Sequence, residues 1–325
     1  MNAALPTLNP SDRILILTSS STGNNVFCTP ALRLLRKHLP HSVIDVVALN
    51  KLSAEVFEGN PDINAVHIAG KPRTFDKLAA GYDKVLAFNV NALKKLAGMA
   101  TQPITVTPAP GLHVAEQLLS FAAGLLGCEI SDADRRYIIG EGKGAPSRIL
   151  DKVDVGDEDV LVNIHLGCGR TLLHGWKIFY RQRAVDKKMW PIEAYIELGQ
   201  ALVRADPRIR ITVTGTRNEA YLARQFVREV PGSVSLAGQT SVADLYRLMQ
   251  RLDLFISHDC GVMHIAAATE VPMVGLFGPT NPAATGPYPL RPQHVIIQKP
   301  SMADIGTGDV VSAALRLLSA FPRNK

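Results

Sequence analysis

Short apolar runs and amphipathic segments alternate along most of this 325-residue chain. The apolar runs have the length of buried strands, and the segments between them repeat apolar residues at helical spacing. This alternation predicts an α/β fold with parallel sheets covered by helices on both faces. In the first half, the predicted strands are Ile14–Leu17, Val43–Ala48, Ala65–Ile68, Lys84–Phe88 and Ile104–Thr107, and the predicted helices are Pro30–Lys37, Thr74–Ala80 and His113–Leu126.

A polar, glycine-rich stretch at residues 140–159 interrupts the pattern and predicts a linker between two domains, 1–150 and 151–325. The same alternation then restarts and ends in an amphipathic segment, Asp309–Phe321, that predicts a terminal helix. In this half the predicted strands are Val160–His165, Ile209–Thr214, Leu254–Ile256 and Val274–Phe277, and the other predicted helices are Ile192–Ala205, Glu219–Glu229, Val242–Arg251 and His264–Thr269.

Composition narrows the class of protein. Hydrophobic residues make up 46% and charged residues 20%, which is typical of a globular protein. The net charge of +6 is spread evenly, with 15 Lys and Arg against 12 Asp and Glu in residues 1–150 and 20 against 17 in the rest. Without a dense basic stripe, nucleic-acid binding is a poor fit. The N-terminus shows no signal-peptide pattern, and no apolar run reaches the ~18 residues that span a bilayer.

Cysteine usage favours a cytoplasmic protein. The four cysteines, Cys28, Cys128, Cys168 and Cys260, stand far apart and lack the spacing of a metal site. We therefore expect reduced thiols and no bound metal.

The richest stretch for function is residues 253–282, where a strand runs into a turn at Asp259–Gly261 and a small-residue helix follows. A glycine at a helix start leaves backbone N–H groups that favour an anion such as a diphosphate. Asp259 and His264 flank this turn and offer hydrogen bonds to hydroxyl groups. Together these features predict a nucleotide-sugar site, although the same junction occurs in any doubly wound sheet.

This stretch closely resembles the donor-site signature of the ADP-heptose:lipopolysaccharide heptosyltransferases, glycosyltransferase family 9. Cys260 stands where that family usually has Thr or Ser. The resemblance implies the GT-B fold, two doubly wound Rossmann-like domains facing a central cleft. It also implies that the terminal helix, 309–321, packs back on the first domain. The positions that fit the signature are Asp259, Gly261, His264, Ala267, Ala268, Pro272, Phe277, Gly278, Pro279, Thr280 and Pro282.

The resemblance further implies an inverting glycosyltransferase that moves heptose from ADP-L-glycero-β-D-manno-heptose to the lipopolysaccharide inner core. The first domain would bind this lipid A-core acceptor, with peripheral contact to the cytoplasmic face of the inner membrane. No DxD motif is present near the site, so neither a metal nor a cofactor besides the ADP-sugar donor is expected. Three alternatives stay open: another nucleotide-sugar donor, a nucleotide-sugar 2-epimerase of the same fold, and a non-catalytic nucleotide-sugar-binding protein.

In the first domain, Gly23 predicts a turn at the carboxyl end of a strand, where ligands bind in open α/β sheets. In the family, an Asp after this glycine is thought to be the general base. Here the residue is Asn24, whose amide has no useful basicity. Either Glu116 or His113 serves as base, or Asn24 orients the acceptor while water or donor phosphate takes the proton, or transfer activity has been lost.

Two further features of the second domain point to the donor diphosphate. The turn at 165–169 follows a strand, and Gly167 would let backbone amides approach phosphate, although the turn also fits an ordinary strand–helix connection. The Lys-x-Trp-Pro sequence at 188–191 matches the family, so Lys188 would contact the diphosphate, with Lys187 and Lys177 as alternatives. The basic, aromatic segment 170–186 predicts either an acceptor or membrane loop, or an insertion.

The nucleoside half of the donor has weaker candidates. Glu219 either holds the ribose hydroxyls, as the resemblance implies, or is a favourable first-turn charge. Thr240 and Ser241 lie in a stretch that resembles the family's loop that reads adenine, although Ser241 also fits a helix N-cap. The predicted catalytic residues are Asn24, Lys188, Asp259 and His264, and the predicted donor-binding residues are Gly167, Lys188, Glu219, Thr240, Ser241, Asp259, Cys260, Gly261 and His264.

Overall fold

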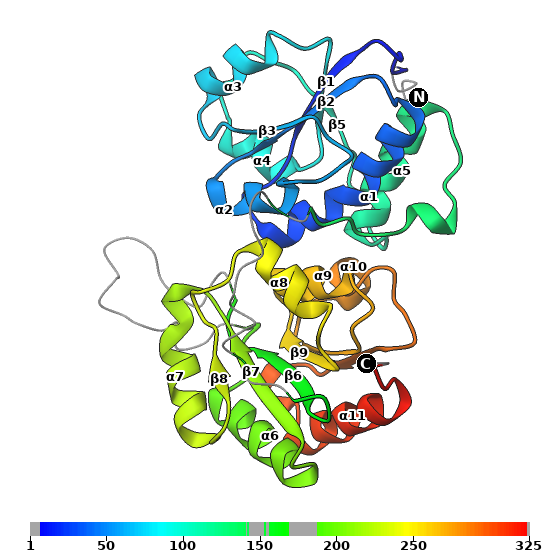
Figure 1. Cartoon of the computed structure of the whole chain (residues 1–325). Helices are drawn as coiled ribbons and strands as arrows, with labels where there is room; N and C mark the ends of the chain where they lie inside the picture. Colours follow the sequence, from blue (N-terminus) through cyan, green and yellow to red (C-terminus); the bar gives the residue numbers. More distant parts are fainter. Residues whose placement is uncertain (1–6, 141, 143–152, 154–155, 169–186, 324–325) are drawn as a thin grey trace. The chain divides into compact units, whose positions relative to one another are not determined.

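A computed structural model describes residues 7–140, 142, 153, 156–168 and 187–323 (Figure 1). The chain forms two compact units, Met1–Gly144 and Ala145–Lys325. The boundary expected between residues 150 and 151 falls in a segment, 143–152, that lies outside the described residues.

The first unit has a five-stranded parallel sheet in the order β3-β2-β1-β4-β5. Its central strand is buried from Ile14 to Leu17, and α1 packs against α5 on one face (Figure 1). On the other face Phe75 and Leu96, which lie on α3 and just after α4, cover the sheet. The bounds are β1 Arg13–Leu17, β2 Val43–Ala48, β3 Ala65–Ile68, β4 Lys84–Ala87, β5 Ile104–Thr105, α1 Thr22–His38, α2 Lys51–Ala54, α3 Pro72–Ala79, α4 Val90–Lys95 and α5 Val114–Leu126.

Helix α1 starts at Thr22, eight residues before the start that Pro30 led us to expect. A proline inside a helix lacks the N–H that would bond the carbonyl four residues earlier, here that of Val26. The Thr29 hydroxyl donates to this Val26 carbonyl at 2.9 Å and so replaces the missing bond. Gly23 and Asn24 consequently lie in the first turn of a helix and not in a loop.

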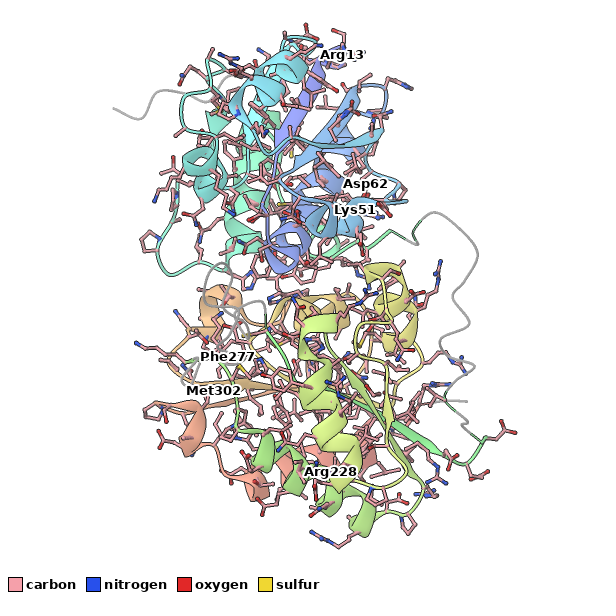
Figure 2. All side chains as sticks on the ribbon, turned by 90° about the vertical axis from the view of Figure 1, so that its left-hand side faces the viewer. Arg13, Lys51, Asp62, Arg228, Phe277 and Met302 are labelled. Atoms are coloured by element: carbon pink, nitrogen blue, oxygen red, sulfur yellow. The ribbon has the colours of Figure 1, made fainter. Side chains whose placement is uncertain are left out.

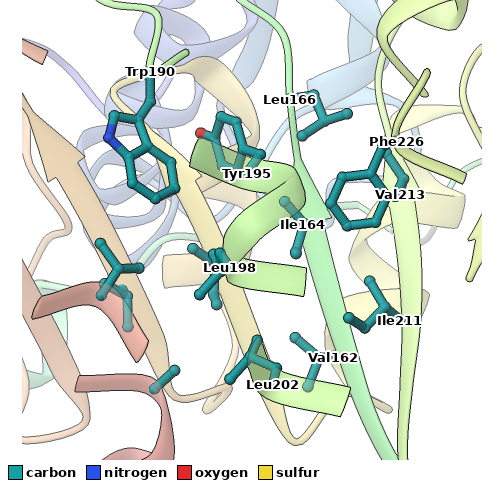
Figure 3. Close-up of a cluster of buried hydrophobic side chains, with 14 of the residues drawn as sticks. Val162, Ile164, Leu166, Trp190, Tyr195, Leu198, Leu202, Ile211, Val213 and Phe226 are labelled. Carbon is teal, nitrogen blue, oxygen red and sulfur yellow. The ribbon is translucent and has the colours of Figure 1, made fainter. Parts of the chain in front are cut away.

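The second unit has a six-stranded parallel sheet in the order β11-β10-β9-β6-β7-β8. Val162 and Ile164 of β6 pack against Leu198 and Leu202 of α6 in its core (Figure 3). The bounds are β6 Val160–His165, β7 Ile209–Thr214, β8 Val234–Ser235, β9 Leu254–His258, β10 Met273–Phe277, β11 His294–Gln298, α6 Ile192–Ala205, α7 Ala220–Glu229, α8 Val242–Met249, α9 Gly261–Ala267, α10 Pro282–Thr285 and α11 Thr307–Ala320, with short 3₁₀ turns at Arg217–Glu219 and Met302–Asp304.

The terminal helix α11 belongs to this second core. Val310, Ala314 and Leu317 are buried together with α6 and the strands β9 and β10. The indole N–H of Trp190 donates to the carbonyl of Ile305 just before the helix, at 3.1 Å. The structure thus places α11 within the second unit, where its apolar face completes the cover of this sheet.

Candidate functional site

The candidate donor residues lie along one edge of the second sheet. Strands β9, β6, β7 and β8 are consecutive neighbours and run parallel, so their carboxyl ends meet at this edge. Ligands of open α/β sheets bind at such an edge. The turns after these four strands carry Asp259, Gly167, Glu219 and Thr240.

An ion pair forms the centre of this edge. Lys188 Nζ lies 2.5 Å from Asp259 Oδ2. The backbone N–H of Asp259 donates a hydrogen bond to the carbonyl of Leu276 in β10 at 3.1 Å. The Asp259 side chain is only 6% exposed, whereas Lys188 is 31% exposed. An ammonium group has three N–H donors, so Lys188 can bind an incoming anion while it still holds Asp259. Lys188, which the sequence analysis placed at the diphosphate, is therefore in direct contact with Asp259, which it placed at the sugar hydroxyls.

The start of α9 lies directly beside this ion pair. Cys260 is the N-cap residue, and its side chain makes no capping hydrogen bond. Burial raises the pKa of the Cys260 thiol to about 12, although the nearby amides of Val262 and Met263 act in the opposite direction. An uncharged thiol is a weak acceptor, so the amides at the helix start keep their capacity to bind an anion. His264 is buried one turn into the helix, at 3% exposure.

Gly167 and Glu219 meet at the next pair of strand ends. A Cβ atom on Gly167 would lie 2.0 Å from the Glu219 carboxyl carbon, so only glycine allows this approach. The Glu219 carboxylate accepts a hydrogen bond from the Thr216 N–H at 2.6 Å and forms a capping box with Thr216. Glu219 is 3% exposed. The capping role left open by the sequence is therefore present, and a ribose contact would come in addition to it.

The loop with Thr240 and Ser241 packs against the Glu219 turn. Gly238 donates its N–H to the Gly215 carbonyl at 2.8 Å, and a Cβ atom on Gly238 would lie 2.8 Å from the Arg217 Cα. The Ser241 hydroxyl accepts a hydrogen bond from the Asp244 N–H at 3.1 Å, in a second capping box. Ser241 is thus the N-cap of α8, and Thr240 is the partly exposed side chain next to it.

Two buried histidines at this edge were not found from the sequence. The Tyr195 hydroxyl lies 2.8 Å from His258 Nδ1. Burial lowers the pKa of His258 to about 3, and the neighbouring His165 and Lys188 side chains act in the same direction. His258 is therefore uncharged near neutral pH and forms a rigid support beside the Lys188–Asp259 pair. Figure 3 shows Tyr195 on α6 next to Trp190.

A chain of buried polar groups fixes the tautomer of His165. Asn163 donates its amide hydrogens to the carbonyl and hydroxyl of Thr212, so its oxygen faces Thr214. The Thr214 hydroxyl donates its only hydrogen to this oxygen at 2.9 Å. His165 Nδ1, 3.0 Å from the same hydroxyl, must then carry a proton and donate it. Burial lowers the pKa of His165, whereas the Glu219 charge and a hydrogen bond with the Gly167 backbone act in the opposite direction.

The first unit has a different set of groups at the end of β1. The amide of Asn25 accepts a bond from the Ser19 N–H at 2.8 Å and donates to the carbonyls of Ser19 and Ser53 at 3.2 and 2.8 Å. Asn24 lies beside it and donates to the Ser19 hydroxyl at 3.4 Å. Lys95 reaches the Ser20 hydroxyl at 2.5 Å. Between Thr18 and Asn25 the turn contains no carboxylate.

Both residues considered as substitutes for a base have structural contacts. The two carboxylate oxygens of Glu116 accept hydrogen bonds from Arg135, at 3.1 and 3.0 Å. His113 is the N-cap of α5, and its Nδ1 accepts from the Ala115 N–H at 3.0 Å. A carboxylate engaged by a guanidinium and a ring engaged as a cap are poorly placed to take up a proton. These contacts weaken the first of the three interpretations of Asn24.

Part of the predicted site lies outside the described residues, namely the segment 170–186 with the alternative Lys177. Within the described ranges, no group of three or more His, Cys, Asp and Glu side chains is arranged to hold a metal ion. No helix in these ranges is long and apolar enough to cross a membrane.

The two parallel, doubly wound units define the class of protein. The chain has the GT-B fold, and two solved structures share it. A glycosyltransferase family 9 protein from Veillonella parvula has a TM-score of 0.75 and 19% identity, covering 97% of this chain and 99% of that one. The E. coli ADP-heptose lipopolysaccharide heptosyltransferase II has a TM-score of 0.72 and 18% identity, covering 95% and 99%.

The sequence comparisons give the family. A model described as glycosyltransferase family 9 (heptosyltransferase) matches residues 178–314. This match covers less than half of the chain and includes the stretch that carries the resemblance seen in the sequence, which it confirms. Lipooligosaccharide heptosyltransferase 2 of Haemophilus ducreyi is 33% identical over 118 residues, 34% of this chain and 33% of that protein. The chain spans about a third of the length of the first curated relatives it matches, 36% and 33%.

Proposed function

We propose that this protein is an inverting glycosyltransferase that transfers heptose from ADP-L-glycero-β-D-manno-heptose to the inner core of lipopolysaccharide. The observation that carries the proposal is the Lys188–Asp259 ion pair at the carboxyl end of β9, inside the family 9 domain. In this proposal it acts at the cytoplasmic face of the inner membrane.

The ion pair supplies what departure of ADP requires. When the bond between the sugar and the diphosphate breaks, negative charge grows on the leaving phosphate. A partly buried cation at that point stabilises the transition state more than the ground state. Lys188 is such a cation, and the amides at Cys260 and Gly261 add a positive helix end beside it. Asp259 then offers its carboxylate to the sugar hydroxyls, and His264 stands one turn further along α9.

The nucleoside would lie along the neighbouring strand ends. Glu219 is held rigidly by its capping box beside Gly167, and Thr240 lies on the loop that packs against the same turn. In this proposal the Glu219 turn holds the ribose and the Thr240 loop reads the base. The acceptor oxygen, bound by the first unit, attacks the anomeric carbon while ADP leaves.

A second function, binding of the nucleotide sugar without transfer, is favoured by one observation. The turn between Thr18 and Asn25 contains neutral amides and hydroxyls and no carboxylate that could take the acceptor proton. For the enzyme, the proton would go to water or to a donor phosphate while Asn24 orients the acceptor.

A transfer assay decides between these functions. The purified protein is mixed with ADP-L-glycero-β-D-manno-heptose and a lipopolysaccharide acceptor that lacks heptose. We expect ADP release and one added heptose by mass spectrometry, with an α-linkage by NMR because an inverting enzyme converts the β-linked donor. A parallel reaction with UDP- and GDP-sugars tests the donor. Tight donor binding with no product would support the binding protein, and transfer from another nucleotide sugar would overturn the donor assignment.

A further inference from the structure

Two aliphatic side chains stand exposed at the carboxyl end of the first sheet. Leu52 of α2 is 56% exposed, and Ile68, the last residue of β3, is 53% exposed. Single exposed aliphatic residues are common on protein surfaces, whereas grouped ones mark interaction sites. Whether Leu52 and Ile68 lie next to each other therefore decides whether they can form an interaction site.

The backbone brings these two residues to neighbouring segments. Ile68 is paired with Ala48, and the next N–H, of Ala69, bonds the Ala48 carbonyl at 3.2 Å. A Cβ atom on Gly70 would lie 3.1 Å from the Leu49 carbonyl, so the chain after β3 runs against the chain that leads into α2. Leu52 and Ile68 thus occupy one edge of the unit. We call Lys51, Leu52, Ile68, Lys71 and Arg73 the α2–β3 patch.

The charge of the α2–β3 patch is of one sign. Lys51, Lys71 and Arg73 are exposed, and residues 49–53 and 68–74 contain no acid. Lys71 is the N-cap of α3 and Arg73 lies in its first turn. Cations at a helix N-terminus oppose the helix dipole, so local stability does not explain them. Figure 2 labels Lys51 and Asp62 on the first unit. Asp62 is buried, and its nearby positive charges are those of Arg33 and Arg36.

The patch adjoins the turn that carries Asn24. The Asn50 side chain donates to the Ser20 carbonyl at 2.9 Å, and the Asn25 side chain donates to the Ser53 carbonyl at 2.8 Å. These two bonds tie both ends of α2 to the β1–α1 turn. A surface that holds α2 would therefore hold the candidate acceptor turn in a fixed place beside it.

We propose that the α2–β3 patch docks the first unit on an anionic lipid bilayer. Leu52 and Ile68 enter the boundary between headgroups and acyl chains, and the three cations contact the anionic headgroups. Aliphatic residues rimmed by lysine and arginine are the arrangement that binds such an interface. The proposal rests on the proposed function, in which the acceptor is anchored in a membrane, and it assigns the surface that brings the Asn24 turn to it.

Vesicle flotation without donor or acceptor tests the patch independently of transfer. The full chain is mixed with phosphatidylglycerol-containing vesicles or with pure phosphatidylcholine vesicles. We expect binding to the anionic vesicles, lost at high salt because the headgroup attraction is screened. The double variant Leu52→Ser/Ile68→Ser should lower the partition coefficient at least about tenfold, and Lys51→Glu/Lys71→Glu should lower it similarly.

Matched variants on the second unit serve as controls. Leu290 is 65% exposed and Arg228 is exposed on α7, so Leu290→Ser and Arg228→Glu repeat both chemical changes away from the patch. These controls should bind vesicles as wild type does. Equal binding by the patch variants and the controls would overturn the proposal. The proposal would also be overturned if the patch mediated pairing between copies of the chain. Ultracentrifugation would then show a wild-type dimer that the Leu52→Ser/Ile68→Ser variant does not form, and the wild type would not bind vesicles.

The transfer assay separates this proposal from the proposed function. With an acceptor sugar freed of its acyl chains, the patch variants should transfer at the wild-type rate, whereas with vesicle-embedded acceptor they should be slower. If no variant and no wild type transfers sugar but flotation still depends on the patch, the proposed function fails and the docking surface stands.

Discussion

The two sheets of this protein end in turns of different electrostatic character. At the carboxyl edge of the second sheet, a lysine–aspartate pair, a buried glutamate and two uncharged histidines converge. At the end of β1 in the first sheet, the described contacts join serines and asparagines with the ammonium group of Lys95 and the Cys28 thiol. Both edges use the same topology, so the difference comes from side chains alone.

This difference indicates how the chemistry divides between the two units. Departure of a diphosphate needs fixed positive charge, and the second unit provides it at Lys188. Activation of an acceptor hydroxyl usually needs a base, and the described turn at the end of β1 carries an amide, that of Asn24, at this position. In the proposed function, the second unit would therefore assist departure of the diphosphate, and the first unit would position the acceptor hydroxyl.

The largest effect is expected from removal of the cation. Lys188→Ala should slow transfer about 10²- to 10³-fold, because the charge on the leaving diphosphate loses its partner. The same change leaves the buried carboxylate of Asp259 without its ion-pair partner, so stability must be measured as well. Steady-state kinetics and thermal unfolding give both values. Lys187→Ala is the matched control, since Lys187 is an exposed neighbour, and a rate loss there with none at Lys188 would contradict the assignment.

The next effect concerns the amide of the first unit. Asn24→Asp should raise transfer by up to about 10²-fold, since a carboxylate can accept the acceptor proton. The rate should then fall as pH drops through the carboxylate pKa, because the protonated acid is no base. Asn25→Asp is the control: its amide donates to two carbonyls, so a carboxylate there should destabilise the turn. If the Asn24→Asp variant transfers at the wild-type rate while the Glu116→Gln or His113→Ala variant is inactive, the base lies on α5 or at its N-cap.

A smaller effect should follow from crowding the donor edge. In Gly167→Ala the new Cβ meets the Glu219 carboxylate, which should lower the free energy of unfolding by about 1–3 kcal/mol. ADP binding should weaken as well. Glu219→Ala removes the obstructing group, so the double variant should lose less stability than the sum of the two single variants. Additive losses in denaturant unfolding would show that the two residues do not meet.

The effect that is smallest near neutral pH is a pH dependence of the stability of the second unit. Burial lowers the pKa of His258 to about 3 and that of His294 to about 4, whereas both titrate near 6.5 when unfolded. Between these values the unfolded chain binds more protons, so stability falls as pH drops below 6.5. Each histidine adds at most about 1.4 kcal/mol per pH unit to this slope. His258→Asn should flatten the slope in denaturant titrations, and an unchanged slope would show that His258 is already protonated.

The sequence predicted the fold well because strand patterns depend on burial. All nine predicted strands appear, and β8 and β11 were missed since one is two residues long and the other is half exposed. The start of α1 was misplaced because Pro30 was read as the beginning of the helix. The hydrogen bond from the Thr29 hydroxyl to the Val26 carbonyl, which lets the helix continue through Pro30, is seen only in the structure. The packing of α11 could not follow from its amphipathic pattern, which gives a buried face but not its partner.

The candidate site was predictable where a local motif carries it. The Asp259 turn and Lys188 stand in recognisable strings, and the structure joins them across 71 residues. The capping boxes of Glu219 and Ser241 are also visible as Thr-x-x-Glu and Ser-x-x-Asp. His258 and Tyr195 could not be paired from sequence, because they lie on different elements 63 residues apart and meet only in the folded core.

The proposed function requires the carboxyl edge of the second sheet to be an ADP-sugar site organised by Lys188. Calorimetry of the full chain with ADP, GDP and UDP tests it most directly, with wild type and Lys188→Ala compared under identical salt. We expect ADP to bind at least about tenfold more tightly than GDP or UDP, a difference in binding free energy of about 1.4 kcal/mol. Lys188→Ala should weaken ADP binding without unfolding the protein. Equal affinity for the three nucleotides, or ADP binding that is unchanged in Lys188→Ala, would contradict the proposed function.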